Sequence, residues 1–317
     1  VLTSGGDSPG MNPAIRAVVR TAITHHLEVY GIYQGYQGLL EEKIFQMNLR
    51  DVGNILQRGG TVLQSSRCPE FHDQANREKA ASILRSHQID ALIVIGGDGS
   101  FNGAHLLSTE NNFTVMGIPG TIDNDISGTQ YTIGFDTALQ TAVEAVDKIR
   151  DTASSHNHTF LIEVMGKSSG AIAMHTGICC GAEWVVLPND QLNLAKLANS
   201  IQAGIARGKT SSIIIVAEGK TTGLSYQVSQ ELKEKHNISS KVCVLGHTQR
   251  GGSPSALDRF RASHMGYLAV TNLLAGNINQ VTTYNDGHFT MTDLSQCLKK
   301  KNEVPEEMQI ILETLSH

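Results

Sequence analysis

Asp123 and Asp125 are the residues of this sequence best placed to do chemistry. They belong to the segment Pro119-Gly-Thr-Ile-Asp-Asn-Asp125, which follows the apolar residues 116–118. Side chains two positions apart point the same way in an extended segment. We therefore expect both carboxylates to face one pocket beyond a strand, where one of them could act as a general base.

Two further loops could hold phosphate and metal. Ser4-Gly5-Gly6-Asp7 precedes an expected helix, and Gly96-Gly-Asp-Gly-Ser100 follows the apolar run 91–95. Glycine lets backbone N–H groups approach an anion, and a helix N-terminus adds a favourable dipole. In the second loop, Asp98 could hold Mg²⁺ and Ser100 could serve as N-cap. Either loop alone could be an ordinary acidic turn, since Gly and Asp are common turn residues.

Other nucleotide-binding motifs are excluded by their spacing. Neither glycine loop fits GxGxxG, so a nicotinamide dinucleotide is poorly supported. Three sequences, at 166–168, 208–210 and 219–221, resemble the end of a P-loop. The earlier glycine that a P-loop requires is replaced by Leu161, Ala203 and Ile214. The sequence therefore excludes a P-loop kinase.

The elements that must position these loops alternate along the chain. Short apolar, β-branched runs predict buried parallel strands at 29–33, 91–95, 114–118, 160–164 and 212–217. Amphipathic stretches between them predict helices near 12–26, 73–87, 134–150, 192–207 and 224–236. This pattern predicts an α/β fold with helices on both faces of mainly parallel sheets. Ligands bind such sheets beyond the carboxyl ends of the strands, which is where all three loops lie.

Composition limits the class of protein. The 317 residues are 40% hydrophobic and 17% charged, which is typical of one large or two medium globular domains. A net charge of −5 predicts neither a nucleic acid nor a membrane as partner. Five cysteines without zinc spacing predict a reduced, cytoplasmic protein. No apolar run approaches the ~18 residues that span a bilayer, and no signal segment opens the sequence. It begins as if within a strand, so we expect a few residues to precede Val1.

Taken together, the motifs resemble the bacterial-type ATP-dependent 6-phosphofructokinase family. TSGGDSPGMN, SSRCPEF, VIGGDGS, GIPGTIDND, DTASSH, EVMGK and GHTQRGGSP occur in the order of that family and cover essentially the whole chain. The stretch 241–259, with Gly-His-x-Gln-Arg-Gly-Gly and a later Asp-Arg, looks like the signature of the family. Each motif alone would be a modest signal, but the ordered set is a strong one.

The resemblance implies a role for each matching residue. Asp123 would be the general base for the sugar 1-hydroxyl, with Thr121, Asp125 and Lys167 also catalytic, and Asp98 would bind Mg²⁺. Residues implied to hold ATP are Gly6, Tyr36, Arg67, Cys68, Gly97, Asp98, Gly99, Ser100 and Gly103. Residues implied to hold fructose 6-phosphate are Thr121, Ile122, Asp123, His158, Met165, Gly166, Lys167, Glu218, Lys241, His247 and Arg250. Gly99 and Gly120 favour ATP over pyrophosphate, because pyrophosphate-using relatives typically carry Asp and Lys there.

The resemblance also implies regulation and assembly. The effector site of the family, which binds ADP or phosphoenolpyruvate between subunits of a homotetramer, is matched by Arg16, Arg20, Arg150, Gly181, Glu183, Arg207 and Lys209. An effector match on Arg16 and Arg20 competes with the simpler reading of a solvated helix face. Two Rossmann-like three-layer domains are implied, with the active site in the cleft between them. We expect an ATP-binding domain at 1–134 and 249–299, and a sugar-phosphate and effector-binding domain at 135–248 and 300–317.

Several positions depart from the family pattern. His158, Lys167 and Lys241 stand where arginines usually contact the sugar phosphate or the transferring phosphoryl group, and His72 replaces a frequent Arg on the nucleotide side. Lysine keeps the charge but loses the bidentate fork of arginine. Two alternatives to the kinase therefore stay open. One is a non-catalytic regulatory homologue, and the other is a kinase for another sugar phosphate, such as sedoheptulose 7-phosphate or tagatose 6-phosphate.

Overall fold

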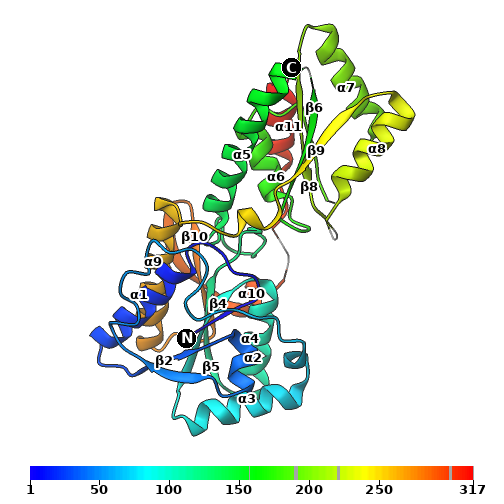
Figure 1. Cartoon of the computed structure of the whole chain (residues 1–317). Coiled ribbons are helices and arrows are strands. Elements are labelled where there is room, and N and C mark those ends of the chain that lie inside the picture. The colour runs from blue at the N-terminus through cyan, green and yellow to red at the C-terminus, as the bar shows by residue number, and fades with distance from the viewer. Residues whose placement is uncertain (157, 189–191, 220–221, 300–301, 317) are drawn as a thin grey trace. The chain divides into compact units, whose positions relative to one another are not determined.

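The chain forms two compact units, which we describe separately (Figure 1). A computed structural model describes residues 1–156, 158–188, 192–219, 222–299 and 302–316. Unit 1 comprises Val1–Thr137 and Arg250–Asn302, and unit 2 comprises Ala138–Gln249 and Glu303–His317. Lys220 and Thr221 of the third P-loop-like sequence lie outside the described residues. Within the described part of the chain, no helix is both long and apolar enough to cross a bilayer.

Unit 1 is built on a seven-stranded sheet in the order β11-β10-β5-β4-β1-β2-β3. The central pairs β2–β1, β1–β4, β4–β5 and β5–β10 are parallel, and the outer pairs β2–β3 and β10–β11 are antiparallel. The strands are β1 (Leu2–Ser4), β2 (Val29–Ile32), β3 (Ile44–Met47), β4 (Ala91–Gly96), β5 (Thr114–Pro119), β10 (Gln280–Asn285) and β11 (His288–Asp293). The helices are α1 (Met11–Thr24), α2 (Gly35–Leu40), η1 (Pro69–His72), α3 (Gln74–Ser86), α4 (Asp98–Asn111), α9 (Ala256–Leu274) and α10 (Leu294–Cys297).

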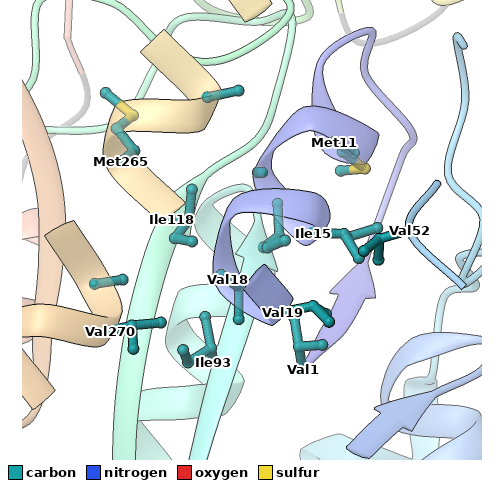
Figure 2. Packing of buried hydrophobic residues seen from close by; sticks show 14 of the residues in the cluster. Val1, Met11, Ile15, Val18, Val19, Val52, Ile93, Ile118, Met265 and Val270 are labelled. Atoms are coloured by element: carbon teal, nitrogen blue, oxygen red, sulfur yellow. The ribbon is translucent and has the colours of Figure 1, made fainter. Parts of the chain in front are cut away.

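Helices cover both faces of this sheet because its strands are apolar on both sides. Ile93 and Ile95 of β4 pack with α1 and α9, and Figure 2 shows this cluster around Ile15 and Met265. Leu92 and Val94 of the same strand point to the opposite cluster, under α2, α3 and α4. Alternate residues of a strand face opposite sides of the sheet, so an unbroken apolar run must be covered by helices on both faces.

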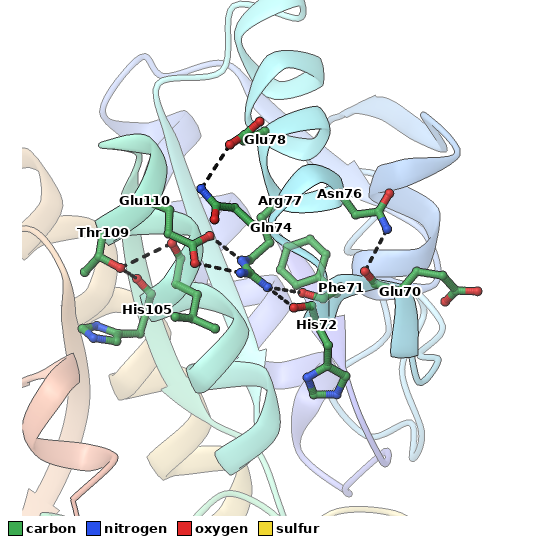
Figure 3. Close-up of polar contacts among 11 residues, drawn as sticks. Glu70, Phe71, His72, Gln74, Asn76, Arg77, Glu78, His105, Thr109 and Glu110 are labelled. Atoms are coloured by element: carbon green, nitrogen blue, oxygen red, sulfur yellow. Dashed lines mark hydrogen bonds and ion pairs between the residues drawn. The ribbon is translucent and has the colours of Figure 1, made fainter.

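A partly buried ion pair, in which only the arginine is buried, joins α3 to α4 on the second face. Arg77 donates from Nε and Nη2 to the two carboxylate oxygens of Glu110, at 2.6 and 2.7 Å (Figure 3). Its Nη1 donates to the carbonyl oxygens of Phe71 and His72, at 2.8 and 2.7 Å. One guanidinium therefore fixes both the far end of α4 and the short helix η1.

Unit 2 contains a four-stranded, wholly parallel sheet in the order β7-β8-β6-β9. Its strands are β6 (Thr159–Val164), β7 (Trp184–Val186), β8 (Ser212–Ala217) and β9 (Ser240–Val244). Its helices are α6 (Ala171–Cys179), α7 (Leu194–Ala206), α8 (Leu224–His236), η2 (Gly246–Gln249) and α11 (Glu306–Leu315). Leu161, Ile214 and Val216 pack under α7 and α8. Helix α5 (Phe135–His156) begins in unit 1 and continues into unit 2.

The predicted class, α/β with mainly parallel sheets in two Rossmann-like units, is confirmed. All five predicted strands and all five predicted helices are present, with ends that differ by a few residues. The domain boundaries and the ligands assigned to each domain stay predictions.

Candidate active site

The strand register brings the three candidate loops of unit 1 to one edge of the sheet. Ser4 pairs with Gly96, and Gly96 pairs with Pro119, so β1, β4 and β5 end side by side. The Gly120 N–H donates to the Gly96 carbonyl at 3.0 Å. An added Cβ at Gly5 would lie 3.4 Å from Ser100 Oγ. The loops after β1, β4 and β5 are therefore direct neighbours.

The aspartate loop is buried, but its backbone is not extended. Thr121, Asp123 and Asp125 are only 8%, 1% and 6% exposed. Residues 122–123 form a turn, and Asn124 is left-handed with φ 51°. The expectation that the segment carrying Asp123 and Asp125 is extended is therefore wrong, because β5 ends at Pro119 and the chain turns after Thr121. The Asp123 N–H donates to Thr121 Oγ1 at 3.2 Å, so the turn is held locally.

A second segment, residues 132–134, fixes this turn from the side. Ile133 donates to the Pro119 carbonyl at 2.8 Å and accepts from the Thr121 N–H at 3.1 Å. Thr132 Oγ1 donates to the Thr121 carbonyl at 2.6 Å, and its N–H donates to Asn124 Oδ1 at 2.8 Å. The position of the aspartate loop thus depends on residues about ten positions further along the chain.

Asp98 opens helix α4. The N-cap is Gly97 and the helix begins at Asp98, so the expectation that Ser100 is the N-cap is wrong. Ser100 lies in the first turn and is buried. An added Cβ at Gly99 would meet nothing within 4 Å. A carboxylate in the first turn beside open backbone suits a cation shared with phosphate oxygens, because Mg²⁺ is usually held by one or two carboxylates plus phosphates. Among the described residues, no group of three or more His, Cys, Asp or Glu could hold a metal by itself.

Tyr36 and Gly103 lie behind this loop. The Tyr36 hydroxyl donates to the Ser100 carbonyl at 2.7 Å, and its ring stacks on Phe71 with centroids 4.0 Å apart. Burial raises the pKa of Tyr36. An added Cβ at Gly103 would lie 3.1 Å from both rings. These contacts indicate that Tyr36 and Gly103 support the α4 N-terminus from within the unit.

The loop that carries Arg67 and Cys68 lies beside the first glycine loop. Ser65 Oγ donates to the Gly5 carbonyl at 2.5 Å, and the Gly5 N–H donates to the Ser66 carbonyl at 3.4 Å. Arg67 is exposed, so it is accessible to an anion. Burial raises the pKa of the Cys68 thiol, which keeps it protonated at neutral pH.

Arg250 lies over the first glycine loop. Its Nη1 donates to the Asp7 carbonyl at 3.0 Å, and an added Cβ at Gly6 would lie 2.5 Å from the same nitrogen. Arg250 was predicted to hold the sugar phosphate and Gly6 to hold ATP. The structure places these two residues in contact.

Unit 2 gathers most of its predicted sugar-phosphate residues at the carboxyl edge of its own sheet. Val164 pairs with Ala217, so Met165 and Glu218 follow neighbouring strands. The Met165 N–H donates to the Gln249 side chain at 2.8 Å, which ties it to the short helix that contains His247.

The predicted catalytic Lys167 follows this edge in a left-handed conformation. Gly166 has φ 129° and Lys167 has φ 46°. Positive φ is uncommon for a residue other than glycine, and it recurs at functional sites.

His158 and Lys241 lie at the opposite, amino edge of that sheet. Thr159 pairs with Ser240, so the exposed His158 and Lys241 flank one strand pair. They do not join Met165 and Glu218 within unit 2. His158 precedes β6 and Lys241 lies at the start of β9, whereas Met165 and Glu218 follow the ends of β6 and β8.

Most predicted effector residues also lie at this amino edge. Lys209 Nζ is 3.2 Å from Glu183 Oε1, and Glu183 accepts the Ile213 N–H at 2.6 Å. Arg150 Nη2 donates to the Cys180 and Gly181 carbonyls. Arg207 is exposed at the C-cap of α7.

Arg16 and Arg20 belong to unit 1, on α1. They are four positions apart on the same helix face. Partial burial lowers the pKa of Arg16, and the positive charge of Arg20 lowers it further. The two guanidinium groups are therefore close to one another.

Sequence reasoning missed three residues that organise these edges: Thr132, Gln249 and Asp258. Gln249 and Asp258 lie in the signature-like stretch 241–259, so a signal was present. Thr132 gave none, because a single Thr in a loop is uninformative.

Known proteins similar to this chain were found by family, by sequence and by structure. The family described as Phosphofructokinase matches residues 1–273. The ATP-dependent 6-phosphofructokinases of Bacillus thuringiensis (strain Al Hakam) and Bacillus cereus are 49% identical over 316 residues, covering 100% of this chain and 98% of each relative.

Similar solved structures include phosphofructokinase from Saccharomyces cerevisiae, with a TM-score of 0.85 and 34% identity. The match covers 99% of this chain and 46% of the yeast chain, so this chain spans about half of that relative. A pyrophosphate-dependent phosphofructokinase from Marinobacter aquaeolei shares the fold, with a TM-score of 0.83, 22% identity and coverage of 99% and 90%.

Proposed function

We propose that this chain, which belongs to the phosphofructokinase family, transfers a phosphoryl group from ATP to the 1-hydroxyl of fructose 6-phosphate. The family resemblance read from the motifs is confirmed, and with it a kinase that acts in glycolysis. The observation that carries the proposal is the meeting of the aspartate loop with two glycine loops at one sheet edge.

In this proposal, Asp123 takes the proton from the sugar hydroxyl. It is a buried carboxylate held by its own turn, so it needs little reorganisation before reaction. The loop after β1 and the N-terminus of α4 would bind the phosphates of ATP through backbone N–H groups and Arg67. Catalysis by positioning and charge neutralisation is what phosphoryl transfer requires.

We propose Mg²⁺ as the metal, held by Asp98 together with the phosphates of ATP. The chemistry that such an ion supplies is neutralisation of charge on the phosphate oxygens. Asp98 fits this role because oxygen ligands suit Mg²⁺. ATP rather than pyrophosphate is supported by the two small positions. Gly99 is open, and at Gly120 an added Cβ would already lie 3.0 Å from Ile95 Cγ2.

We propose that Met165, Gly166, Lys167, Glu218, His247 and Arg250 bind fructose 6-phosphate, and that His158 and Lys241 serve a neighbouring subunit of a homotetramer. The placement of His158 and Lys241 at the opposite sheet edge supports a contact outside their own unit. We also propose that ADP or phosphoenolpyruvate binds at Arg150 and Lys209. Both cationic side chains lie at the amino edge of the unit 2 sheet, where Arg150 contacts the Cys180 carbonyl and Lys209 Nζ is 3.2 Å from Glu183 Oε1.

The test is a coupled assay of the purified chain with ATP, Mg²⁺ and fructose 6-phosphate. Asp123→Asn should lower kcat by about 10²–10⁴-fold, the contribution of a general base. Asp51→Asn, at an exposed turn, is the matched control and should keep full activity. No turnover by the unmodified chain would favour the regulatory homologue, and faster turnover of another sugar phosphate would favour the alternative acceptor. Full activity of Asp123→Asn would overturn the assignment of the base.

A further inference from the structure

We propose that Asp258 is a positioning residue for the catalytic loop, acting through residues 132–137. The inference rests on the proposed function, since it takes Asp123 as the base. Asp258 is about 120 positions from the segment it holds, and no motif reading assigned it a role.

Asp258 is a fully buried carboxylate that accepts three hydrogen bonds from one short segment. Its Oδ1 accepts the Gly134 N–H at 2.9 Å. Its Oδ2 accepts the Thr137 N–H at 2.8 Å and the Thr137 hydroxyl at 2.5 Å. Exposure is 0%, so water does not share these bonds. Asp258 thereby caps the N-terminus of α5 from a different helix.

The segment held by Asp258 is the one that fixes the aspartate loop. Gly134 directly follows Thr132 and Ile133, which bond to Thr121, Asn124 and Pro119. Gly134 has φ 101°, and an added Cβ would lie 2.6 Å from Ser8 Cβ, so this turn has little freedom to shift. A displacement at Gly134 would therefore move the support of Asp123.

The carboxylate is itself held rigidly. Ser255 caps α9 by accepting the Asp258 N–H at 3.1 Å, and its own N–H donates to Thr137 Oγ1 at 2.9 Å. The Ser255 hydroxyl also donates to Asp136, in the first turn of α5. The starts of α5 and α9 thus cap each other. Burial and the nearby Asp136 raise the pKa of Asp258 to about 6, so the group is ionised and accepting at neutral pH.

A simpler role, stabilisation of α5 alone, predicts a different result. Loss of a cap lowers stability, but it leaves the kcat of the folded enzyme unchanged. Loss of positioning lowers kcat even when the protein is folded, because a misplacement of about 1 Å can cost about 10²-fold in rate. The bonds of Asp258 go to Gly134 and Thr137, and the segment that they hold packs on Ser8, beyond the glycines of the loop after β1, so the KM for ATP should change less than kcat.

The experiment compares Asp258→Asn with Glu110→Gln in the assay of the proposed function. Each change replaces one carboxylate oxygen with an NH₂ group that faces an N–H donor; Asp258 is fully buried, and the Glu110 side chain is 21% exposed. Glu110 lies at the far end of α4 and serves as the control for lost stability. We expect Asp258→Asn to lower kcat about 10–100-fold, with the KM for ATP within threefold. Glu110→Gln should keep its kcat.

A double-mutant cycle that combines Asp258→Asn with Thr132→Val tests whether Asp258 acts on the aspartate loop through residues 132–134. If Asp258 acts through residues 132–134, the double variant should be no slower than the slower single variant. Unchanged kcat in Asp258→Asn, or effects that multiply in the double variant, would overturn the inference. If Asp258→Asn does not fold, Thr137→Val removes one of its three bonds, and the same criteria apply. Absence of turnover in the unmodified chain would instead defeat the proposed function, which separates the two failures.

Discussion

The contact between Gly6 and Arg250 gives a prediction whose sign depends on a second residue. Gly6 has no left-handed φ, so Ala fits its backbone. Replacing Gly by Ala at such a position stabilises a protein by about 0.4–1 kcal/mol through the unfolded chain. The added Cβ, however, would lie 2.5 Å from Arg250 Nη1 and 2.9 Å from its Cζ.

The guanidinium must move away, and this breaks its 3.0 Å bond to the Asp7 carbonyl. A hydrogen bond from a charged group contributes about 1.5–3 kcal/mol. Gly6 is exposed and Arg250 is partly exposed, so we take the lower part of that range. Gly6→Ala should therefore destabilise unit 1 by about 1 kcal/mol net, equivalent to a fall in Tm of about 2–4 °C for a unit of this size.

The assay is thermal unfolding of four proteins: the unmodified chain, Gly6→Ala, Arg250→Met and the double variant. Methionine keeps most of the aliphatic stem and removes the guanidinium. Without that group the clash is absent, so Gly6→Ala should raise Tm in the Arg250→Met background. An equal loss of stability in both backgrounds would refute the reasoning.

Three other outcomes follow from the structure. Glu110→Gln should lower the free energy of unfolding by about 2 kcal/mol in a denaturant titration, because the guanidinium of Arg77, whose side chain is 5% exposed, loses its carboxylate partner. The control Glu231→Gln removes a surface pair with Lys235, in which the glutamate is 46% exposed, and should change the free energy of unfolding by less than about 0.5 kcal/mol. His158→Arg should lower the KM for fructose 6-phosphate about 10-fold and leave the KM for ATP unchanged, since arginine adds a charge-assisted contact; an unchanged sugar-phosphate KM would contradict the role of this edge. The pKa of Asp258 is raised from 3.8 to about 6 in the folded protein, so between these pH values the folded chain binds a proton that the unfolded chain has lost. The free energy of unfolding should therefore fall by on the order of 2 kcal/mol as pH rises from about 4 to 6. In Asp258→Asn, unfolding measured across that range should lack this slope.

The sequence determined the parts of this protein that depend on local pattern. Apolar runs such as 91–95 and 114–118 read as buried strands because both faces are apolar, and the glycine and aspartate loops directly follow them. Ordered motifs then identified the family. Local pattern was less informative for β10 and β11, whose residues show neither clean periodicity nor a chemical motif, and for the part of α9 that follows Arg259.

Only the tertiary structure decided which of these parts meet. The order β5-β4-β1 makes neighbours of loops that are about 90 and 25 positions apart, and no local rule specifies that order. Long-range contacts also bring Arg250 against Gly6 and bond Asp258 to Gly134. The strand register places His158 at the edge of its sheet opposite to Met165. Side-chain periodicity is a property of a few consecutive residues, whereas strand order and buried polar contacts arise from packing of the whole unit.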